Sequence, residues 1–223
     1  PSEVAEDIVF SNNRESGSRV GGFTIHTGYR VTIENNVFES SVSYSTTNGS
    51  IIRNNIIEAT TLANGGGIVA GRKDKFEKVY NNKIYGNTIK NYGIGMVLSN
   101  TKLEVYDNKI IDCSFGISLE DINNSKVYNN TITSDLSNSN GIVNGGASVF
   151  VDDVLIEKNT IKVTKAPIKI FNTNVDLEEN IINIIGNKLE SSNPSIIGNS
   201  SGVNFSQNTI TLGYLYLTKT NNC

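Results

Sequence analysis

The amino-acid sequence predicts an all-β fold, a parallel β-helix in which short strands stack coil upon coil along one axis. Three observations predict it: an asparagine-centred phrase that recurs along the chain, short runs of alternating apolar and polar residues, and a composition suited to strands and turns. The chain has 223 residues, with 20 Gly, 3 Pro and no Trp. Asn, Ile, Val, Ser and Thr are abundant, and these residues favour strands and tight turns over helices.

The recurring phrase has the form h-x-h-x-x-N-x-h, where h is an apolar residue. It is clear in "VTIENNVFE", "LEVYDNKII" and "VLIEKNTIK", and it returns at intervals of 19 to 32 residues. The shortest interval has room for two short strands and a turn but not for an amphipathic helix. The phrase fits at Asn13, Asn36, Asn55, Asn87, Asn108, Asn130, Asn159, Asn180 and Asn208.

A second phrase precedes most of these anchors and begins with Gly or another small residue, followed by alternating apolar positions. This pattern indicates a turn that leads into a short strand. Each repeat therefore holds at least two strands. The second phrase reads "GGFTIH", "GGGIVAG", "YGIGMVL", "FGISLE", "NGIVNG" and, more loosely, "APIKIF".

A strand with one apolar face must cover that face, and one repeat has too few residues to do so alone. Stacking equivalent strands about 4.8 Å apart buries the apolar side chains in continuous columns. Asn carries both a donor and an acceptor and can bond to the Asn of the next coil. We therefore expect about nine coils with an internal Asn ladder, in a single domain over residues 1–223. Loop insertions are expected near 60–80 and 134–153, where the intervals are long and Gly-rich.

From "DIVFSNN" to "FSQNTITL" the chain resembles the right-handed parallel β-helix superfamily. That superfamily includes pectate-lyase-like enzymes, polysaccharide hydrolases, epimerases and bacteriophage tailspikes. The resemblance implies a single-stranded, right-handed solenoid and a polysaccharide ligand, although such coils carry many activities. The Arg-x-Pro-x-x-Arg pattern of pectate lyases and the Gly-His-Gly and Asn-Thr-Asp patterns of polygalacturonases are absent from the sequence, so no catalytic role transfers from them.

The outward-facing positions predict a binding face. If the residue three before each anchor points inward, the residue two before it points outward. Tyr85, Tyr106 and Tyr128 then stack on consecutive coils, beside a Lys, Glu, Lys column that includes Lys83 and Lys126. Flat aromatic faces beside charged groups suit sugar rings, so we expect these five residues to bind carbohydrate. The alternative is that such ladders only stabilise an exposed sheet.

A cluster of acidic residues predicts a catalytic site. Glu157 and Glu178 are expected in the same outward column of successive coils, with Asp176 on the same face. Carboxylates about 5 to 9.5 Å apart would suit glycoside hydrolysis, and a Ca²⁺ ion could use oxygens at this pitch. Glu157, Asp176 and Glu178 are therefore the candidate catalytic residues, and no other cofactor is expected. A solvated acidic patch would have the same sequence pattern.

His26, the single histidine, follows the strand "GGFTI" and is expected to point outward. An exposed imidazole could act as a general base or contact an acidic sugar. The alternative is that His26 ends a strand and has no role in binding.

The overall charge and hydropathy argue against two kinds of partner. The 19 basic and 22 acidic residues are interspersed, which provides no basic face for nucleic acid or anionic lipid. No apolar run approaches the roughly 18 residues of a membrane helix.

Cys113 and Cys223 indicate no disulfide framework. The chain begins at Pro1 without an initiator Met, so we expect it to be a portion of a longer protein.

These features favour a segment that recognises or depolymerises carbohydrate in a bacteriophage tailspike-like appendage, on a virion tail or secreted. The resemblance to tailspikes implies a homotrimer, in which neighbouring chains could cover an outward apolar patch such as Ile51, Val97, Leu155 and Phe171. One alternative is a free-standing secreted bacterial polysaccharide lyase, epimerase or glycoside hydrolase. Another is a purely structural or adhesive β-solenoid. Whether the chain is an enzyme stays open at this point.

Overall fold

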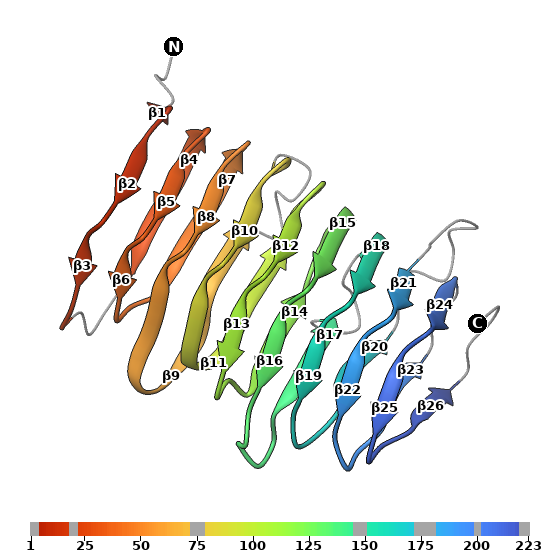
Figure 1. Cartoon of the computed structure of the whole chain (residues 1–223). Coiled ribbons are helices and arrows are strands. Elements are labelled where there is room, and N and C mark those ends of the chain that lie inside the picture. Colours follow the sequence, from red (N-terminus) through yellow and green to blue (C-terminus); the bar gives the residue numbers. More distant parts are fainter. Residues whose placement is uncertain are drawn as a thin grey trace.

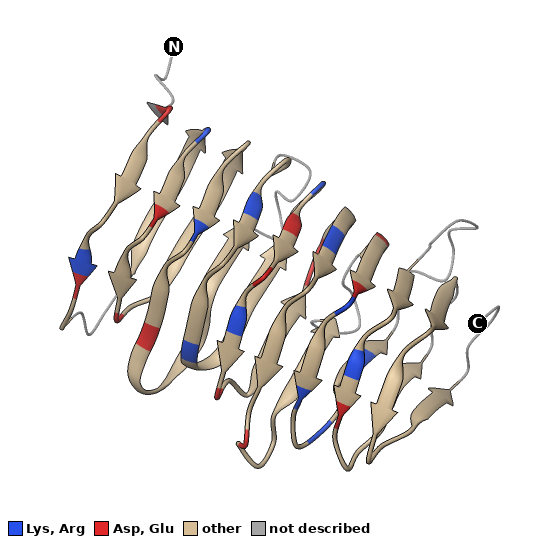
Figure 2. Ribbon diagram, in the orientation of Figure 1, with Lys and Arg blue, Asp and Glu red and all other residues tan. Residues whose placement is uncertain are grey.

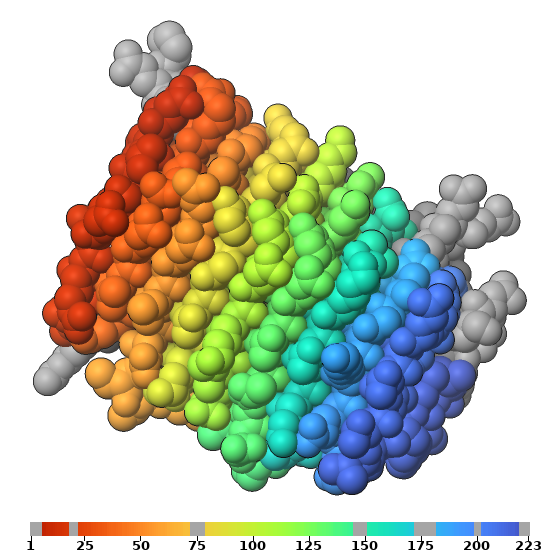
Figure 3. All heavy atoms as spheres, viewed as in Figure 1, coloured from red at the N-terminus to blue at the C-terminus, as the bar shows by residue number. Residues whose placement is uncertain are grey.

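The chain is a solenoid of parallel strands whose coils lie side by side from one end of the molecule to the other (Figures 1 and 3). The computed structural model describes residues 5–17, 22–71, 79–144, 151–171, 182–198 and 202–218. Within these ranges every regular element is a β-strand, and every strand pairing is parallel. The predicted all-β parallel β-helix is confirmed.

Each full coil has three faces, and the first face is a separate 9-stranded sheet. Its strands end two residues before the anchoring asparagines, and each pairs in register with its equivalent in the next coil. They are β2 (Val9–Ser11), β5 (Thr32–Glu34), β8 (Ile51–Arg53), β10 (Lys83–Tyr85), β12 (Glu104–Tyr106), β15 (Ile122–Tyr128), β18 (Val151–Glu157), β21 (Ile182–Ile185) and β24 (Val203–Ser206).

The second and third faces belong to one 17-stranded sheet, because two long strands, β9 (Ile56–Gly71) and β11 (Thr88–Ser99), run through both. The other strands of the second face are β3 (Arg14–Glu15), β6 (Val37–Phe38), β13 (Lys109–Ile111), β16 (Thr131–Thr133), β19 (Thr160–Lys162), β22 (Lys188–Glu190) and β25 (Thr209–Thr211). The third face adds β1 (Ala5–Glu6), β4 (Phe23–Tyr29), β7 (Val42–Asn48), β14 (Phe115–Leu119), β17 (Asn140–Asn144), β20 (Ile168–Phe171), β23 (Ser195–Gly198) and β26 (Leu215–Thr218).

The expected insertion near residues 60–80 falls largely on β9, which continues to Gly71. Residues 72–78 of that segment and residues 145–150 of the second expected insertion lie outside the described residues. The assignment of the whole chain to one domain stays a prediction.

Apolar side chains from all three faces form the core. The residue three before each anchor points inward, as predicted, and Ile84, Val105 and Val127 on consecutive coils are fully buried. The residue two after the anchor does the same on the second face, where Ile110 and Ile132 are buried. Every coil thus contributes one rung to the same apolar columns, which no coil could bury alone.

The predicted asparagine ladder, called the asparagine spine below, runs through the interior at the turn between the first and second faces. In each coil the backbone N–H and side-chain Nδ2 of the asparagine donate to Oδ1 of the asparagine in the next coil, at 2.9 to 3.1 Å. Nδ2 also bonds to backbone carbonyls that have left the strand ladders; Asn108 Nδ2, for example, reaches Ile84 O and Tyr106 O. The asparagine spine consists of Asn13, Asn36, Asn55, Asn87, Asn108, Asn130, Asn159, Asn187 and Asn208.

One predicted anchor is wrong. Asn187, not Asn180, continues the spine, because Asn159 donates to Asn187 Oδ1 and Asn187 donates to Asn208 Oδ1. The residue just before each spine asparagine adopts a left-handed conformation, with φ between 53° and 65°. Gly186 supplies this conformation before Asn187 without steric cost, whereas Glu179 before Asn180 would carry a Cβ penalty.

A close approach between the backbones of neighbouring coils explains the Gly-rich phrase. Gly95, Gly116 and Gly141 stand on consecutive coils, each just before a residue that pairs across the sheet. A Cβ on Gly116 would lie 2.6 Å from Ile132 Cγ2 and 2.8 Å from Gly141 O. The backbones approach too closely for any side chain, so the sequence must place glycine there.

Candidate functional site

The tyrosine column lies on the outer surface of the first face. Strands β10, β12 and β15 place Tyr85, Tyr106 and Tyr128 directly opposite one another, which confirms the predicted column. The ring centroids of Tyr85 and Tyr106 are 4.7 Å apart with planes 6° apart, and those of Tyr106 and Tyr128 are 5.0 Å apart with planes 10° apart. All three side chains are half-buried.

This stacking corrects one detail of the predicted binding mode. The rings lie face to face along the solenoid axis, so both faces of Tyr106 are covered by its neighbours. Sugar rings therefore cannot stack on the face of Tyr106 as the sequence suggested. The column instead presents ring edges and a row of phenol hydroxyls, which are polar groups that can donate and accept hydrogen bonds.

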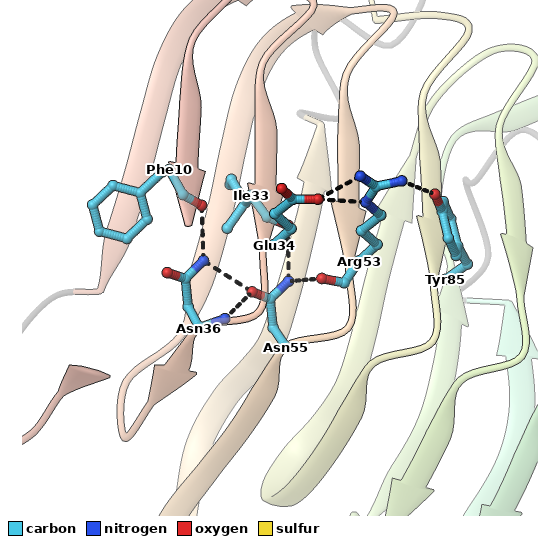
Figure 4. A network of polar contacts seen from close by, with 7 residues as sticks. All are labelled: Phe10, Ile33, Glu34, Asn36, Arg53, Asn55 and Tyr85. Carbon is cyan, nitrogen blue, oxygen red and sulfur yellow. Dashed lines mark hydrogen bonds and ion pairs between the residues drawn. The ribbon is translucent and has the colours of Figure 1, made fainter. Parts of the chain in front are cut away.

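An ion pair extends the same column toward the N-terminal end (Figure 4). Arg53 Nε lies 2.6 Å from Glu34 Oε2, and Arg53 Nη1 donates to the hydroxyl of Tyr85 at 2.9 Å. The guanidinium therefore fixes the position of the first hydroxyl in the row. Arg53 is not among the residues that the sequence analysis proposed for binding. The available signal was an arginine two residues before the anchor Asn55, one coil before the aromatic run.

The second column of the face, called the charged column below, contains Lys83, Glu104 and Lys126 in register. Lys83 Nζ is 3.3 Å from Glu104 Oε1, and the Tyr128 hydroxyl donates to Glu104 Oε2 at 3.4 Å. Lys126 is exposed and forms no ion pair with any described residue. Figure 2 shows these alternating charges on the first face.

The pKa of Tyr128 is raised to about 12, because partial burial and then the Glu104 carboxylate and Tyr106 disfavour the phenolate. Burial and the neighbouring Tyr85 also raise the pKa of Tyr106. Both hydroxyls therefore stay protonated at neutral pH. The Tyr106 hydroxyl can donate a hydrogen bond to a ligand, whereas the Tyr128 hydroxyl donates to Glu104 and can accept one from a ligand.

A family model described as "Right handed beta helix region" matches residues 3–153. The chain belongs to this right-handed β-helix family. That match also confirms the predicted handedness. Comparison with curated proteins gives no match.

Solved structures share the right-handed β-helix at low sequence identity. A family 28 exopolygalacturonase of Yersinia enterocolitica has a TM-score of 0.69 at 12% identity, covering 89% of this chain and 43% of its own. The A-module of the Azotobacter vinelandii mannuronan C-5 epimerase AlgE6 has a TM-score of 0.60 at 16% identity, covering 98% of this chain and 59% of its own. PfbA, a surface adhesin of Streptococcus pneumoniae, has a TM-score of 0.57 at 11% identity, and the match covers 99% of this chain and 70% of the PfbA chain. The chain thus spans about half the length of the first two.

The acidic column predicted for this β-helix changes with the corrected register. Ile185, not Glu178, pairs with Glu157, and Asn183 occupies the position expected for Asp176. The register argument that brought Glu157 and Glu178 together is therefore wrong. Asp176 and Glu178 themselves lie outside the described residues, and the catalytic role of the three acids stays a prediction.

His26 does not join the tyrosine column. It is exposed on β4 of the third face, whereas the tyrosine and charged columns lie on the first face. Among the described residues no three His, Cys, Asp or Glu side chains cluster closely enough to hold a metal ion. No described helix is long and apolar enough to cross a membrane.

The apolar patch expected to drive trimer formation is divided between two faces. Ile51 and Leu155 lie on the first face, and Val97 and Phe171 on the third. All four are half-buried. They form no continuous exposed surface, so the predicted homotrimer has no support from these residues and stays a prediction.

Proposed function

We propose that this β-helix segment binds a polysaccharide along its first face, through the tyrosine column and the charged column. The observation that carries the proposal is the row of three phenol hydroxyls at the pitch of the coils, anchored by Arg53 and flanked by Lys83, Glu104 and Lys126. A linear glycan presents hydroxyls at regular intervals and can pair with such a row over several coils.

The charges on this face favour an acidic glycan. Lys83 is held by Glu104, whereas Lys126 has no described anionic partner. An exposed ammonium group beside the Tyr128 hydroxyl can receive a carboxylate or sulfate of the ligand, and a charged hydrogen bond is stronger than a neutral one. Lys126 would therefore set the preference for acidic over neutral chains.

Recognition is better supported than cleavage. Glu104 and Glu157 lie on β12 and β18, two coils apart, so their backbones are about 9.6 Å apart at least. The Glu104 carboxylate is already engaged by Lys83 and by the Tyr128 hydroxyl, and the Glu157 carboxylate lies 3.7 Å from Lys158 Nζ. The second proposal is that the chain belongs to a polysaccharide lyase, epimerase or glycoside hydrolase. Its catalytic pair would then include Asp176 or Glu178.

The proposed setting is a secreted or surface-exposed protein, with a tailspike-like appendage among the candidates. The fold is shared with proteins named as an exopolygalacturonase, a mannuronan epimerase and a surface adhesin. These names support a polysaccharide or cell-surface role. The low identities mean that the likeness concerns the fold, so the ligand has to be found by experiment.

A glycan array probed with the purified chain tests the proposal, followed by titration calorimetry with any acidic glycan it binds. Tyr106→Phe should weaken binding about tenfold while the ring stack and the melting temperature are kept. Lys126→Gln should weaken binding of acidic glycans more than of neutral ones. Tyr216→Phe is the control, because Tyr216 is exposed on the third face.

Two results would contradict the proposal. Unchanged affinity in Tyr106→Phe and Lys126→Gln would place the glycan elsewhere on the molecule. No binding to any glycan, together with lowered stability of Tyr106→Ala, would support the purely structural β-solenoid instead.

A further inference from the structure

Two buried oxygen atoms on neighbouring coils have no hydrogen-bond partner, at the point where the chain passes from the third face to the first. They are Asn123 Oδ1 on β15 and Asp152 Oδ1 on β18. The two residues pair in register, so their side chains leave neighbouring coils side by side, about 4.8 Å apart. A buried polar atom without a partner needs an explanation, and a bound water molecule or ion is a common one.

Other polar side chains that meet in register combine a donor with an acceptor. On the same face Asn204 Nδ2 donates to Asn183 Oδ1 at 3.0 Å, and the asparagine spine repeats this arrangement through the interior. Asn123 Oδ1 and Asp152 Oδ1 are both acceptors, so neither can bond to the other. Two neighbouring acceptors, one of them in a carboxylate, favour a cation between them.

The surroundings of this pair are acidic. Asp153 follows Asp152, and Glu120 and Asp121 come shortly before Asn123 in the sequence. Asp152 forms no ion pair with any described residue. Several carboxylates around one spot create a negative potential that attracts cations from solution.

The spacing of the coils favours Ca²⁺ over Mg²⁺. Ca²⁺ binds oxygen at about 2.3 to 2.6 Å, so two of its ligands can stand up to about 5 Å apart. Mg²⁺ binds oxygen at about 2.0 to 2.1 Å, which limits two ligands to about 4.2 Å, less than the coil spacing of about 4.8 Å. Amide and carboxylate oxygens are both ligands of Ca²⁺, and water molecules can fill its other positions.

We propose that Asn123 Oδ1 and Asp152 Oδ1 bind one Ca²⁺ ion that bridges the coils of β15 and β18. The Thr101 hydroxyl is the next buried oxygen without a partner in the same row, one coil earlier, and it can hydrogen-bond to a water molecule on the ion. The site has a single carboxylate, so we expect a dissociation constant of about 0.1 to 1 mM, as in weak Ca²⁺ modules. The inference is independent of glycan binding, because neither ligand belongs to the tyrosine column or the charged column.

Calorimetric titration of the full chain with calcium chloride, after removal of metal ions with a chelator, tests the proposal. The wild type should bind one Ca²⁺ ion, and about 5 mM Ca²⁺ should raise its melting temperature by several degrees. The same concentration of Mg²⁺ should have a much smaller effect. Asp152→Asn should weaken Ca²⁺ binding about tenfold or more. Asp135→Asn, which removes an exposed carboxylate from another turn, is the matched control and should bind Ca²⁺ like the wild type.

Asn123→Asp is the sharpest variant, because it distinguishes a bound ion from a direct hydrogen bond between the two side chains. A second carboxylate beside Asp152 should tighten Ca²⁺ binding about tenfold. With chelator the two carboxylates repel each other, so the variant should melt below the wild type, and Ca²⁺ should restore its melting temperature.

Three results would overturn the proposal. The first is a wild-type chain whose melting temperature does not respond to Ca²⁺ or responds equally to Mg²⁺. The second is unchanged Ca²⁺ binding in Asp152→Asn, which would place the ion elsewhere. The third is an Asn123→Asp variant that is destabilised equally with Ca²⁺ and with chelator, because that result indicates a direct bond from Asn123 Nδ2 to Asp152. Circular dichroism with chelator should show that all variants are folded.

Discussion

The asparagine spine and the tyrosine column lie two residues apart in every coil that holds both, yet the spine points into the solenoid from the turn and the column points outward from the first face. Tyr106 and Asn108 illustrate the contrast. Asn108 is 2% exposed and its amide hydrogen-bonds to the coils on both sides. Tyr106 is half-buried and contacts its neighbours only through its ring. The residue between them, Asp107, has a φ of 54°, and this left-handed turn separates inside from outside.

The contrast teaches that one repeat can carry two ladders with different purposes. In the spine each donor and acceptor is used within the protein, so a missing member leaves buried groups without partners. In the tyrosine column the rings pack on one another and the Tyr106 hydroxyl has no partner among the described residues. The Tyr85 hydroxyl accepts from Arg53 and can still donate, and the Tyr128 hydroxyl donates to Glu104 and can still accept. We therefore expect spine substitutions to affect stability and column substitutions to affect binding.

Asn108→Ala should have the largest effect on stability. The substitution leaves the N–H of Asn87 and the carbonyl of Ile84 without their buried partners, and each orphaned group costs about 1 to 3 kcal/mol. We expect the free energy of unfolding in urea to fall by about 3 kcal/mol or more. Asn13→Ala at the exposed end of the spine is the matched control and should have a much smaller effect. Equal effects at both positions would remove the distinction between interior and end.

Gly116→Ala should have the second-largest effect on stability, because Gly95, Gly116 and Gly141 form an interior row in which neighbouring coils approach closely. The new methyl group would lie 2.6 Å from Ile132 Cγ2, and forcing atoms into a packed core costs about 1 to 3 kcal/mol. Thermal unfolding followed by circular dichroism should show the loss. Gly93→Ala is the comparison, since its Cβ would lie 3.5 Å from Ala63 O and Gly65 N, an ordinary van der Waals distance. Similar melting temperatures for the two variants would mean that neighbouring coils are not closely packed at Gly116.

Tyr106→Ala should destabilise the chain by only about 1 kcal/mol, the size of cross-strand aromatic pairs in exposed sheets. Tyr106→Phe keeps the rings stacked and should be nearly neutral. Urea unfolding of both variants measures the difference. A loss as large as that of Asn108→Ala would make the tyrosine column part of the structural framework and weaken the proposed division of roles.

Lys158→Gly should stabilise the chain slightly. Lys158 precedes Asn159 in the spine and has a φ of 53°, a conformation that costs a residue with a Cβ about 1 kcal/mol or more relative to glycine. The greater freedom of glycine in the unfolded chain offsets part of that gain. Gly186→Ala, the reverse change at the equivalent turn, should be destabilising. A Lys158→Gly variant that unfolds more easily than the wild type would contradict this account of the turn.

The smallest effect concerns alkaline pH. The pKa of Tyr128 is raised to about 12 by burial and by Glu104, compared with about 10 in an unfolded chain. Its contribution to stability is fully present below pH 10 and is lost as pH rises toward 12. The free energy of unfolding should therefore decline over this interval, and less so in Tyr128→Phe. Tyr44, Tyr92 and Tyr106 also have raised pKa values, so an ultraviolet titration of Tyr128→Phe should show one fewer late-titrating phenol than the wild type.

Much of the interior could be predicted from sequence, because the spine and the apolar columns each demand one residue type per coil. The failure at Asn180 is instructive, since both Asn180 and Asn187 fit the apolar frame. The frame alone ignored the preceding turn residue. Requiring a residue that tolerates positive φ would have favoured Gly186–Asn187 over Glu179–Asn180, and would have placed Ile185 rather than Glu178 beside Glu157.

The outer surface was less predictable. The column of Tyr85, Tyr106 and Tyr128 follows from the repeat, but the orientation of the rings does not, because it depends on side-chain torsions and neighbours. Their mutual stacking decides that edges and hydroxyls, not ring faces, meet a ligand. The link from Arg53 to the Tyr85 hydroxyl likewise depends on geometry that periodicity does not specify.

The most direct test of the division between spine and column is a crystal structure of the chain with a bound acidic oligosaccharide identified on the glycan array. The sugar should lie along the first face, with its hydroxyls bonded to the phenols of Tyr106 and Tyr128 and an anionic group beside Lys126. A sugar bound to the second or third face, with the tyrosine hydroxyls contacting only water, would contradict it.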